Sequence, residues 1–530
     1  MNSDRSFEFF LILTCVLAAI CVSRIPDFFL FDNVVFGDFG SVLTIDFLVT
    51  HGYRPVIDFG YHYGLLPILL AHLWFQVIGR TPLALVGLAF FYNLIFVWGL
   101  AKLAVRLRMD TAGRLLLICS LGFMTLSATC HGLEAVLLCN GLAQQAHGRY
   151  DRSLAFACAS VFVKPSMGYV YGGLLLLGIF FGLRRIGGDK TSNRVALLAP
   201  AAITSIGLSL LLAAVYGYAS LAETLLPFVG MKAYDAQRFG FFFGSGRYFW
   251  HPAGVNWKYY LGTVTALWLA GSVYLVIVAG ACVSRQWGAD AEGHESDRAT
   301  IDVIVVTCAA CQVAFIFLFF GGPFSWFYYV YLIPVGIGAA SASGYATRVV
   351  AWCFCGLALL SYKASAGGVY QLWRTTAPSS QTAGLWMPPD EREEWLAILR
   401  LARAHQLLVF SGESSAALLF PGFTPPTGVW LFPGLPNARE LQRVHQQLAR
   451  ATLLIVPTMP IAGPAPNWQE LAPVLAEFNE IEKGKFFAVY QRNKTAAVVP
   501  STLFRTRRIT INGPGGSALD SAPPPGRDTL

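Results

Sequence analysis

Long apolar runs separated by short polar segments occupy most of the chain up to residue 365. A helix that crosses a bilayer needs about 20 mostly apolar residues. Candidate runs lie at residues 8–30, 82–105, 114–130, 132–147, 153–163 joined to 168–184, 195–216, 259–283, 300–320, 326–343 and 347–365. The apolar run from Leu65 to Ile78 has only 14 residues, so we expect it to lie at the membrane surface. The pattern predicts an α-helical polytopic membrane protein with about 11 spans.

Basic residues gather between alternate apolar runs and so orient the predicted spans. They occur at 102–114, 149–152, 184–194, 284–299 and 348. Because cytoplasmic loops carry an excess of Lys and Arg, we expect a cytoplasmic N-terminus. The extracytoplasmic face then receives a first external loop at 31–80, the turn at 131–134, Lys164, the aromatic loop at 217–258 and the C-terminal region.

The C-terminal region changes from apolar runs to alternating helix and strand patterns. Helices are expected at 390–404, 438–451 and 468–477, and strands at 407–410, 453–456 and 486–491. This alternation predicts a small soluble α/β domain at 370–510, extracytoplasmic and separate from the transmembrane module at 1–369. Within it, 411–415 is interpreted as a strand exit and a helix cap. The Gly, Pro and Ser-rich end at 511–530 is expected to be disordered.

The composition excludes an ordinary soluble protein. Of the 530 residues, 55% are hydrophobic and 13% are charged, whereas soluble domains average about 25% charged residues. The net charge of +8 is spread over many short loops, so nucleic acid is not an expected partner. All 11 cysteines precede residue 356, within or beside apolar runs, where free cysteine behaves as a small hydrophobe. We expect no structural disulfide and no zinc site.

A segment that follows the first apolar run holds ionisable and aromatic groups close to the predicted membrane. Ionisable groups are costly in that environment and usually have a function. It contains Gly37-Asp38-Phe39-Gly40, and residues 52–66 follow the pattern G-Y-x-P-x-x-D-F-x-Y-x-Y-G-x-L. This arrangement resembles the first external loop of GT-C glycosyltransferases, polytopic enzymes that use polyprenyl-phosphate-linked sugars. The likeness extends moderately to the pattern of spans, and to the C-terminal domain only in its placement.

The resemblance implies transfer of one sugar from a polyprenyl-phosphate donor to a lipid, glycan or protein acceptor on the extracytoplasmic face. The expected location is a bacterial inner (plasma) membrane, with membrane lipids as further partners and a divalent metal left open as a cofactor. Two other classes stay open. One is a transporter or flippase of a lipid-linked sugar, although no internal repeat is found, and the other is a ligase or polymerase of envelope polysaccharide.

Such a reaction needs a base on the acceptor and cations on the donor phosphate. The resemblance implies that Asp38 is the general base, between Gly37 and Gly40, which let the backbone approach a substrate closely. The alternative is that Asp38 caps a helix that begins near Ser41. Asp46 is expected to face water from an interfacial helix and is not assigned to the site.

The second acid of the loop, Asp58, matches the D-F of the pattern. We expect it to bind sugar hydroxyls or to hold Arg54 or His62 in position, and a plain salt bridge with Arg54 is the alternative. Arg54, His62 and Tyr63 are assigned to substrate binding with it. The histidines of the region lack the spacing of metal ligands, so we expect hydrogen bonds and no metal site. They are His51, His62 and His72.

Farther along the chain, Glu134 lies at the outer end of a predicted span, where relatives of this class carry an acid that contacts a metal or the donor phosphate. The alternative is an ordinary interfacial residue. Lys164 would neutralise the donor phosphate if it faces a cavity, or snorkel if it faces lipid, and Pro165 favours a broken helix beside a cavity. Arg238 and Arg247, in the aromatic loop, are expected to bind phosphate or to belong to an interface belt.

Overall fold

The computed structural model describes part of the chain, and everything below concerns that part. The described residues are 29–35, 38–61, 63–107, 127–180, 194–225, 276–277, 279–280, 282, 302–311, 379–404, 408–410, 415–423, 438–458, 473–474 and 476–493. The predicted spans at 326–343 and 347–365 lie outside these residues, as do most of those at 8–30, 114–130 and 259–283. The predicted disordered end at 511–530 also lies outside them.

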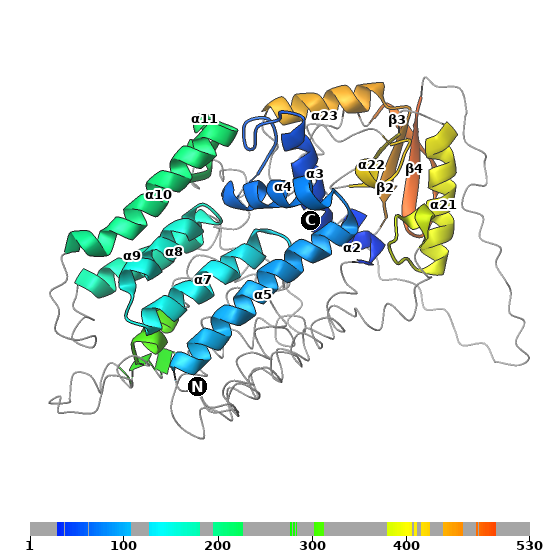
Figure 1. Ribbon diagram of the computed structural model, residues 1–530. Coiled ribbons are helices and arrows are strands. Elements are labelled where there is room, and N and C mark those ends of the chain that lie inside the picture. Colours follow the sequence, from blue (N-terminus) through cyan, green and yellow to red (C-terminus); the bar gives the residue numbers. More distant parts are fainter. Residues whose placement is uncertain are drawn as a thin grey trace, which may run out of the picture.

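Helices that correspond to predicted apolar runs lie side by side as a slanted bundle (Figure 1). They are α5 (Pro82–Arg106), α7 (Cys130–Ala146), α8 (Tyr150–Val161), α9 (Pro165–Phe180) and α10 (Arg194–Tyr216), which leads into α11 (Tyr218–Leu225). The joined run at 153–184 forms two helices, α8 and α9, with Lys164 between them. Pro165 explains the break, because proline fits the first turn of a helix but not its interior.

Two of the described helices are long and apolar enough to cross a bilayer, namely α5 and residues Leu197–Tyr216 of α10. These correspond to the predicted runs at 82–105 and 195–216. At 1.5 Å per residue, α5 extends about 37 Å, which exceeds the hydrocarbon thickness of a typical bilayer.

Three helices of the predicted first external loop lie at one end of the bundle: α2 (Phe31–Val35), α3 (Asp38–Thr50) and α4 (Leu66–Ile78). The helix predicted at 65–78 is confirmed as α4, and it runs across the direction of the bundle helices (Figure 1). α4 buries Leu66, Ile68, Leu69, Ala71 and Phe75. This buried face packs on α3 and α5.

The C-terminal region contains a mixed four-stranded sheet in the order β1-β2-β4-β3. β1 and β2 are parallel, and the other neighbours are antiparallel. Its elements are η4 (Ser380–Thr382), α21 (Pro389–Ala404), β1 (Leu408–Phe410), α22 (Ala416–Leu419), α23 (Ala438–Arg450), β2 (Leu453–Pro457), β3 (Phe478–Lys483) and β4 (Phe487–Arg492). The helices expected at 390–404 and 438–451 and the three expected strands are confirmed within one or two residues.

Strand β3 was not predicted. It begins where a helix was expected to end, and it carries Asn479, Glu480, Glu482 and Lys483 among its six residues. Such a sequence lacks the β-branched and aromatic residues that mark strands. Pairing with the apolar β4 at the edge of the sheet stabilises it instead.

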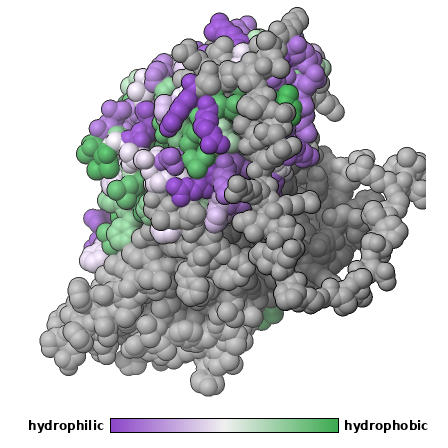
Figure 2. All heavy atoms as spheres, turned by 90° about the vertical axis from the view of Figure 1, so that its right-hand side faces the viewer, coloured by the Kyte–Doolittle hydropathy of each residue, from purple (hydrophilic) through white to green (hydrophobic). Residues whose placement is uncertain are grey.

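One side of the C-terminal unit carries charged, solvent-exposed side chains. On α21, Glu393, Arg400 and Arg403 are exposed, opposite a buried face that includes Trp395, Ile398 and Leu399. Figure 2 shows hydrophilic side chains gathered over the upper part of this side of the molecule.

The C-terminal unit, predicted as a domain of its own, packs against the predicted first external loop. The ring of Trp395 on α21 lies 4.6 Å, centroid to centroid, from the ring of Phe31 on α2. Both residues are fully buried and belong to one continuous hydrophobic cluster that also includes bundle residues. Apolar side chains of the first loop therefore complete the core of the C-terminal unit.

Candidate functional site

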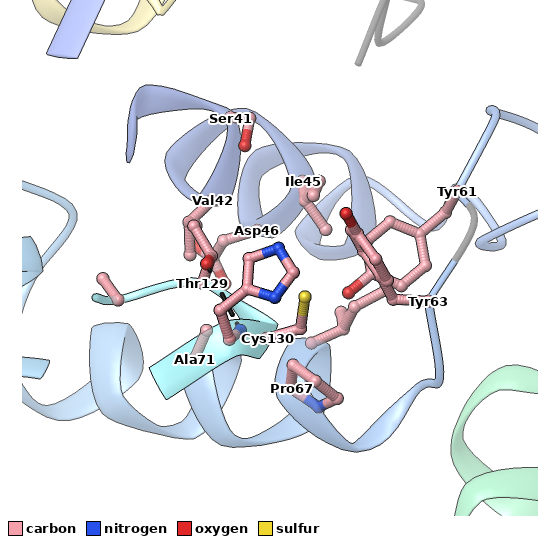
Figure 3. Close-up of a pocket in the computed structure, with 13 residues that line it drawn as sticks. Ser41, Val42, Ile45, Asp46, Tyr61, Tyr63, Pro67, Ala71, Thr129 and Cys130 are labelled. Atoms are coloured by element: carbon pink, nitrogen blue, oxygen red, sulfur yellow. Dashed lines mark hydrogen bonds between the residues drawn. The ribbon is translucent and has the colours of Figure 1, made fainter. Parts of the chain in front are cut away.

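A pocket lies between α3 and α4, and the N-terminus of α7 closes one side (Figure 3). Its polar lining consists of Ser41, Asp46, Tyr61, Tyr63, Thr129 and His131. The rest of the wall is mostly apolar and comes from α3, α4 and the start of α7.

Helix α3 presents one continuous face to this pocket. Ser41, Val42 and Ile45 line it, at the spacing that places residues on one side of a helix. Asp38, the first residue of α3, lies three positions before Ser41 and so occupies the same face of the helix. The side chain of Asp38 itself is outside the described part of the structure.

The expectation that Asp46 faces water is wrong. Asp46 is 2% exposed and lines the pocket. Its Oδ1 lies 2.7 Å from His72 Nδ1, and its Oδ2 accepts a hydrogen bond from Arg80 Nε at 2.6 Å. Because α3 packs against α4, the side of α3 that holds Asp46 is covered. His72 gave a signal of this contact in the sequence. A histidine on an apolar helix needs a polar partner once the helix is packed.

The loop after α3 is attached to the break between α8 and α9. Gly64 N donates to Val163 O at 2.9 Å, and Leu66 N donates to Phe162 O at 3.0 Å. A Cβ on Gly64 would lie 1.9 Å from the carbonyl oxygen of Phe162, so only glycine allows this close approach. The loop and the Lys-Pro-Ser break, which were identified as separate sequence motifs, are therefore in direct contact.

A group of ionisable side chains surrounds this junction. Glu134 is 1% exposed, and its Oε2 lies 3.1 Å from His131 Nδ1. Lys164 Nζ lies 3.9 Å from Glu134 Oε1 and 6.0 Å from the centroid of the Tyr63 ring. The Tyr63 ring in turn meets the His131 ring edge-on at 5.5 Å. Glu134 and Lys164 are thus buried together next to the pocket, so Lys164 does not snorkel.

Asp58 does not line the pocket but fastens the loop that does. Its Oδ2 accepts hydrogen bonds from Arg54 N at 2.9 Å and from Arg54 Nε at 3.2 Å. Arg443 Nη2, from α23, lies 3.7 Å from Oδ1. Burial raises the pKa of Asp58, but the Arg54 hydrogen bonds and the charges of Arg54 and Arg443 outweigh it, and the net pKa is lowered. Asp58 is therefore ionised at neutral pH, and the salt bridge with Arg54, which was the alternative to a role in substrate binding, is present.

Several predicted site residues lie outside the described part of the chain, namely His62, Arg238, Arg247 and the side chain of Asp38. The hydrogen bonds expected of the other histidines are confirmed: His51 Nδ1 lies 2.8 Å from Phe47 O, and His72 bonds Asp46. Among the described residues, no group of three or more His, Cys, Asp or Glu side chains is arranged to hold a metal ion. Sequence reasoning did not assign Asp46, Tyr61, Thr129 or Arg443.

Comparisons with known proteins give structural likenesses at low identity. No protein-family model matches the chain, and no curated protein matches it in sequence. A crystal structure of ArnT from Cupriavidus metallidurans bound to undecaprenyl phosphate aligns with 91% of this chain and 97% of its own, at 10% identity and a TM-score of 0.47. The apo crystal structure of the same protein aligns at 11% identity, 92% and 98% coverage and a TM-score of 0.36. At these scores the likenesses establish neither the fold nor the activity of this chain.

Proposed function

We propose that the chain is a membrane glycosyltransferase that moves a sugar from a polyprenyl-phosphate donor to an acceptor on the extracytoplasmic face. The observation that carries this proposal is the convergence of two distant segments on one pocket. The segment from α3 through the following loop contributes Ser41, Tyr61 and Tyr63, and the start of α7 contributes His131. Both segments were singled out from the sequence for their chemistry.

The surface of the bundle supports a membrane location. Ile203, Ile206 and Leu210 of α10 are 61–71% exposed, as are Leu83 and Trp98 of α5 at 67% and 51%. Large exposed apolar surfaces on a soluble monomer are uncommon, whereas lipid covers them at no cost. The mean hydropathy of +0.54 agrees with this location.

The pocket suits a sugar. Aromatic rings offer flat apolar faces, and hydroxyl groups offer hydrogen bonds. Tyr61 and Tyr63, whose rings meet edge-on at 5.8 Å, supply the former. Ser41 and Thr129 supply hydroxyl groups. Arg54 and Asp58 act behind this wall by holding the loop.

In the proposed reaction, a hydroxyl oxygen of the acceptor forms the new bond to the anomeric carbon of the donor sugar. The bond from that carbon to the phosphate oxygen breaks, and polyprenyl phosphate leaves with the electron pair. Asp38 accepts the hydroxyl proton as general base. Lys164 supports the charge that collects on the leaving phosphate, and Glu134 holds Lys164 and His131 in place. Roles for His62, Arg238 and Arg247 in donor binding remain part of the proposal.

The experiment compares transfer with translocation. Purified protein in liposomes receives a radiolabelled polyprenyl-phosphate sugar and a bacterial envelope extract as acceptor. We expect label in an acceptor product, which needs the protein and increases with time. Donor that crosses the bilayer without any product would establish a transporter instead. Transfer of preassembled chains but not of single sugars would establish a ligase or polymerase.

A further inference from the structure

The C-terminal unit holds the beginning of the first external loop. Phe31 N donates to Trp386 O at 2.9 Å, and Trp386 N donates to Phe29 O at 2.6 Å. At the other end of α2, Ser415 N donates to Val35 O at 2.9 Å, and Ser415 Oγ donates to Val34 O at 2.7 Å. The expected helix-capping bond of the Ser415 side chain is not made, because this hydroxyl bonds α2.

The start of α3 is pressed against the same point. A Cβ on Gly40 would lie 1.7 Å from Val34 O and 2.9 Å from Ser415 Oγ. Gly40 was expected to allow the approach of a substrate, but it allows the approach of α2 and the C-terminal unit. The position of α3, which forms one wall of the pocket, thus depends on contacts with residues more than 370 positions away in the sequence.

A second contact holds the later part of the loop. Arg443 Nη1 on α23 donates to the backbone oxygen of Asp58 at 2.9 Å, and its Nη2 faces the Asp58 carboxylate. The guanidinium carbon lies 4.5 Å from the centroid of the Tyr53 ring, within the range of a cation–π contact. In Figure 1, α23 lies along the side of the molecule where this loop emerges.

The segment between these contacts is strained. Val56 has a φ of +68°, a conformation that β-branched residues rarely adopt. A loop with such a residue keeps its shape only where surrounding contacts determine it. The Arg54–Asp58 bonds lie within the loop itself, whereas Arg443 contacts it from another element.

We propose that the C-terminal unit supports the binding site and that Arg443 is a positioning residue, which holds Tyr61 and Tyr63 in the pocket wall through Asp58 and Tyr53. Asp58 precedes Tyr61 by three residues, so a shift of its backbone moves both tyrosines. This inference rests on the proposed function for its substrate, a polyprenyl-phosphate sugar. It goes beyond that proposal in giving the C-terminal unit a role in donor binding.

If Arg443 holds the loop, its loss lowers the fraction of molecules with a formed pocket. The apparent dissociation constant of a ligand rises by the inverse of that fraction. We therefore expect Arg443→Ala to raise the KM for the donor about three- to tenfold and to leave kcat within about twofold of wild type. Arg443→Lys keeps the charge but not the fork of donors, so its KM should lie between the two.

The matched control is Arg450→Ala, which removes an exposed cation from the same helix and should leave KM and kcat unchanged. A second variant tests the strain. Val56→Gly removes the steric penalty of the positive φ, so in the Arg443→Ala background it should recover part of the lost donor affinity. A merely structural role for Arg443 predicts instead less folded protein with an unchanged KM, and that result would overturn the proposal.

A hydrogen-exchange experiment distinguishes failure of the positioning role of Arg443 from failure of the proposed function. In intact protein without donor, Arg443→Ala should speed amide exchange in peptides from residues 51–66 and not in peptides from α5. If wild type transfers no sugar but this exchange is faster, the holding of the loop stands and the glycosyltransferase proposal fails. If transfer proceeds and neither exchange nor KM changes, the positioning role is wrong.

Discussion

At the scale of single residues, the buried carboxylate of Asp46 is the largest departure from the sequence-based expectation. It is paired with His72 and Arg80, which follow it by 26 and 34 residues. Replacing the carboxylate by an amide removes the negative charge that faces Arg80 and leaves one acceptor oxygen where His72 and Arg80 now meet two. Asp46→Asn should therefore lower the free energy of unfolding by about 2–3 kcal/mol.

Thermal unfolding in detergent measures this effect. Glu393→Gln serves as the control, because Glu393 is an exposed acid on α21 and its loss should change the midpoint little. An Asp46→Asn protein with the midpoint of wild type would mean that the network around Asp46 adds nothing to stability.

Lys164 carries a second prediction at this scale. Lys164→Met should lower kcat/KM about 100-fold, because the cation proposed to support the leaving phosphate is lost. Lys164→Arg keeps the positive charge and should retain more activity than Lys164→Met. Lys102→Met removes an exposed cation of α5 and should leave the rate unchanged. Equal rates for wild type and Lys164→Met would remove Lys164 from the reaction.

Residue types were easier to predict than their contacts. The sequence pointed to Glu134 and Lys164 as isolated ionisable groups near apolar runs, and the structure pairs them across 30 positions. Arg443 gave no such signal, because an arginine on an amphipathic helix is ordinary. Only the fold shows that it reaches a loop 385 positions earlier.

At the scale of elements, the loop and the break between α8 and α9 form one unit. Gly64→Ala would place a methyl group 1.9 Å from Phe162 O, so it must displace the loop or the break. We expect the free energy of unfolding to fall by about 2 kcal/mol or more, and sugar transfer to fall with it because Tyr63 is displaced.

The matched control for this prediction is Gly173→Ala on α9, where an added Cβ meets no atom within 4 Å. Alanine is the better helix former, so this variant should be at least as stable as wild type. The thermal unfolding midpoints of Gly64→Ala and Gly173→Ala, measured in one experiment, test whether only the first variant is destabilised. Similar midpoints for both would contradict the close contact at Gly64.

Elements with a clear period or a proline were predictable from sequence. The break at Pro165, the short helix α4 and the amphipathic α21 follow from local rules. β3 did not, because its side chains are mostly polar and its stability comes from pairing with β4. Local patterns determine helices, whereas edge strands depend on neighbours that the local sequence does not reveal.

At the scale of the whole molecule, the C-terminal unit and the predicted first external loop share a hydrophobic core. Composition indicates a change of character near residue 370, and a boundary there suggests two independent parts. The contacts of Phe31 with Trp395 and of Val34 with Ser415 instead join them. These contacts link positions hundreds of residues apart, which neither periodicity nor composition can indicate.

In the proposed reaction, Asp38 at the start of α3 is the base for sugar transfer. The most direct measurement is the single-turnover rate of transfer from a radiolabelled polyprenyl-phosphate sugar, at saturating donor, for wild type and Asp38→Asn. A general base contributes about 10²–10⁴-fold to the rate. We predict a fall of that size in Asp38→Asn, with donor binding within about threefold of wild type. Transfer by Asp38→Asn at the rate of wild type would contradict the claim.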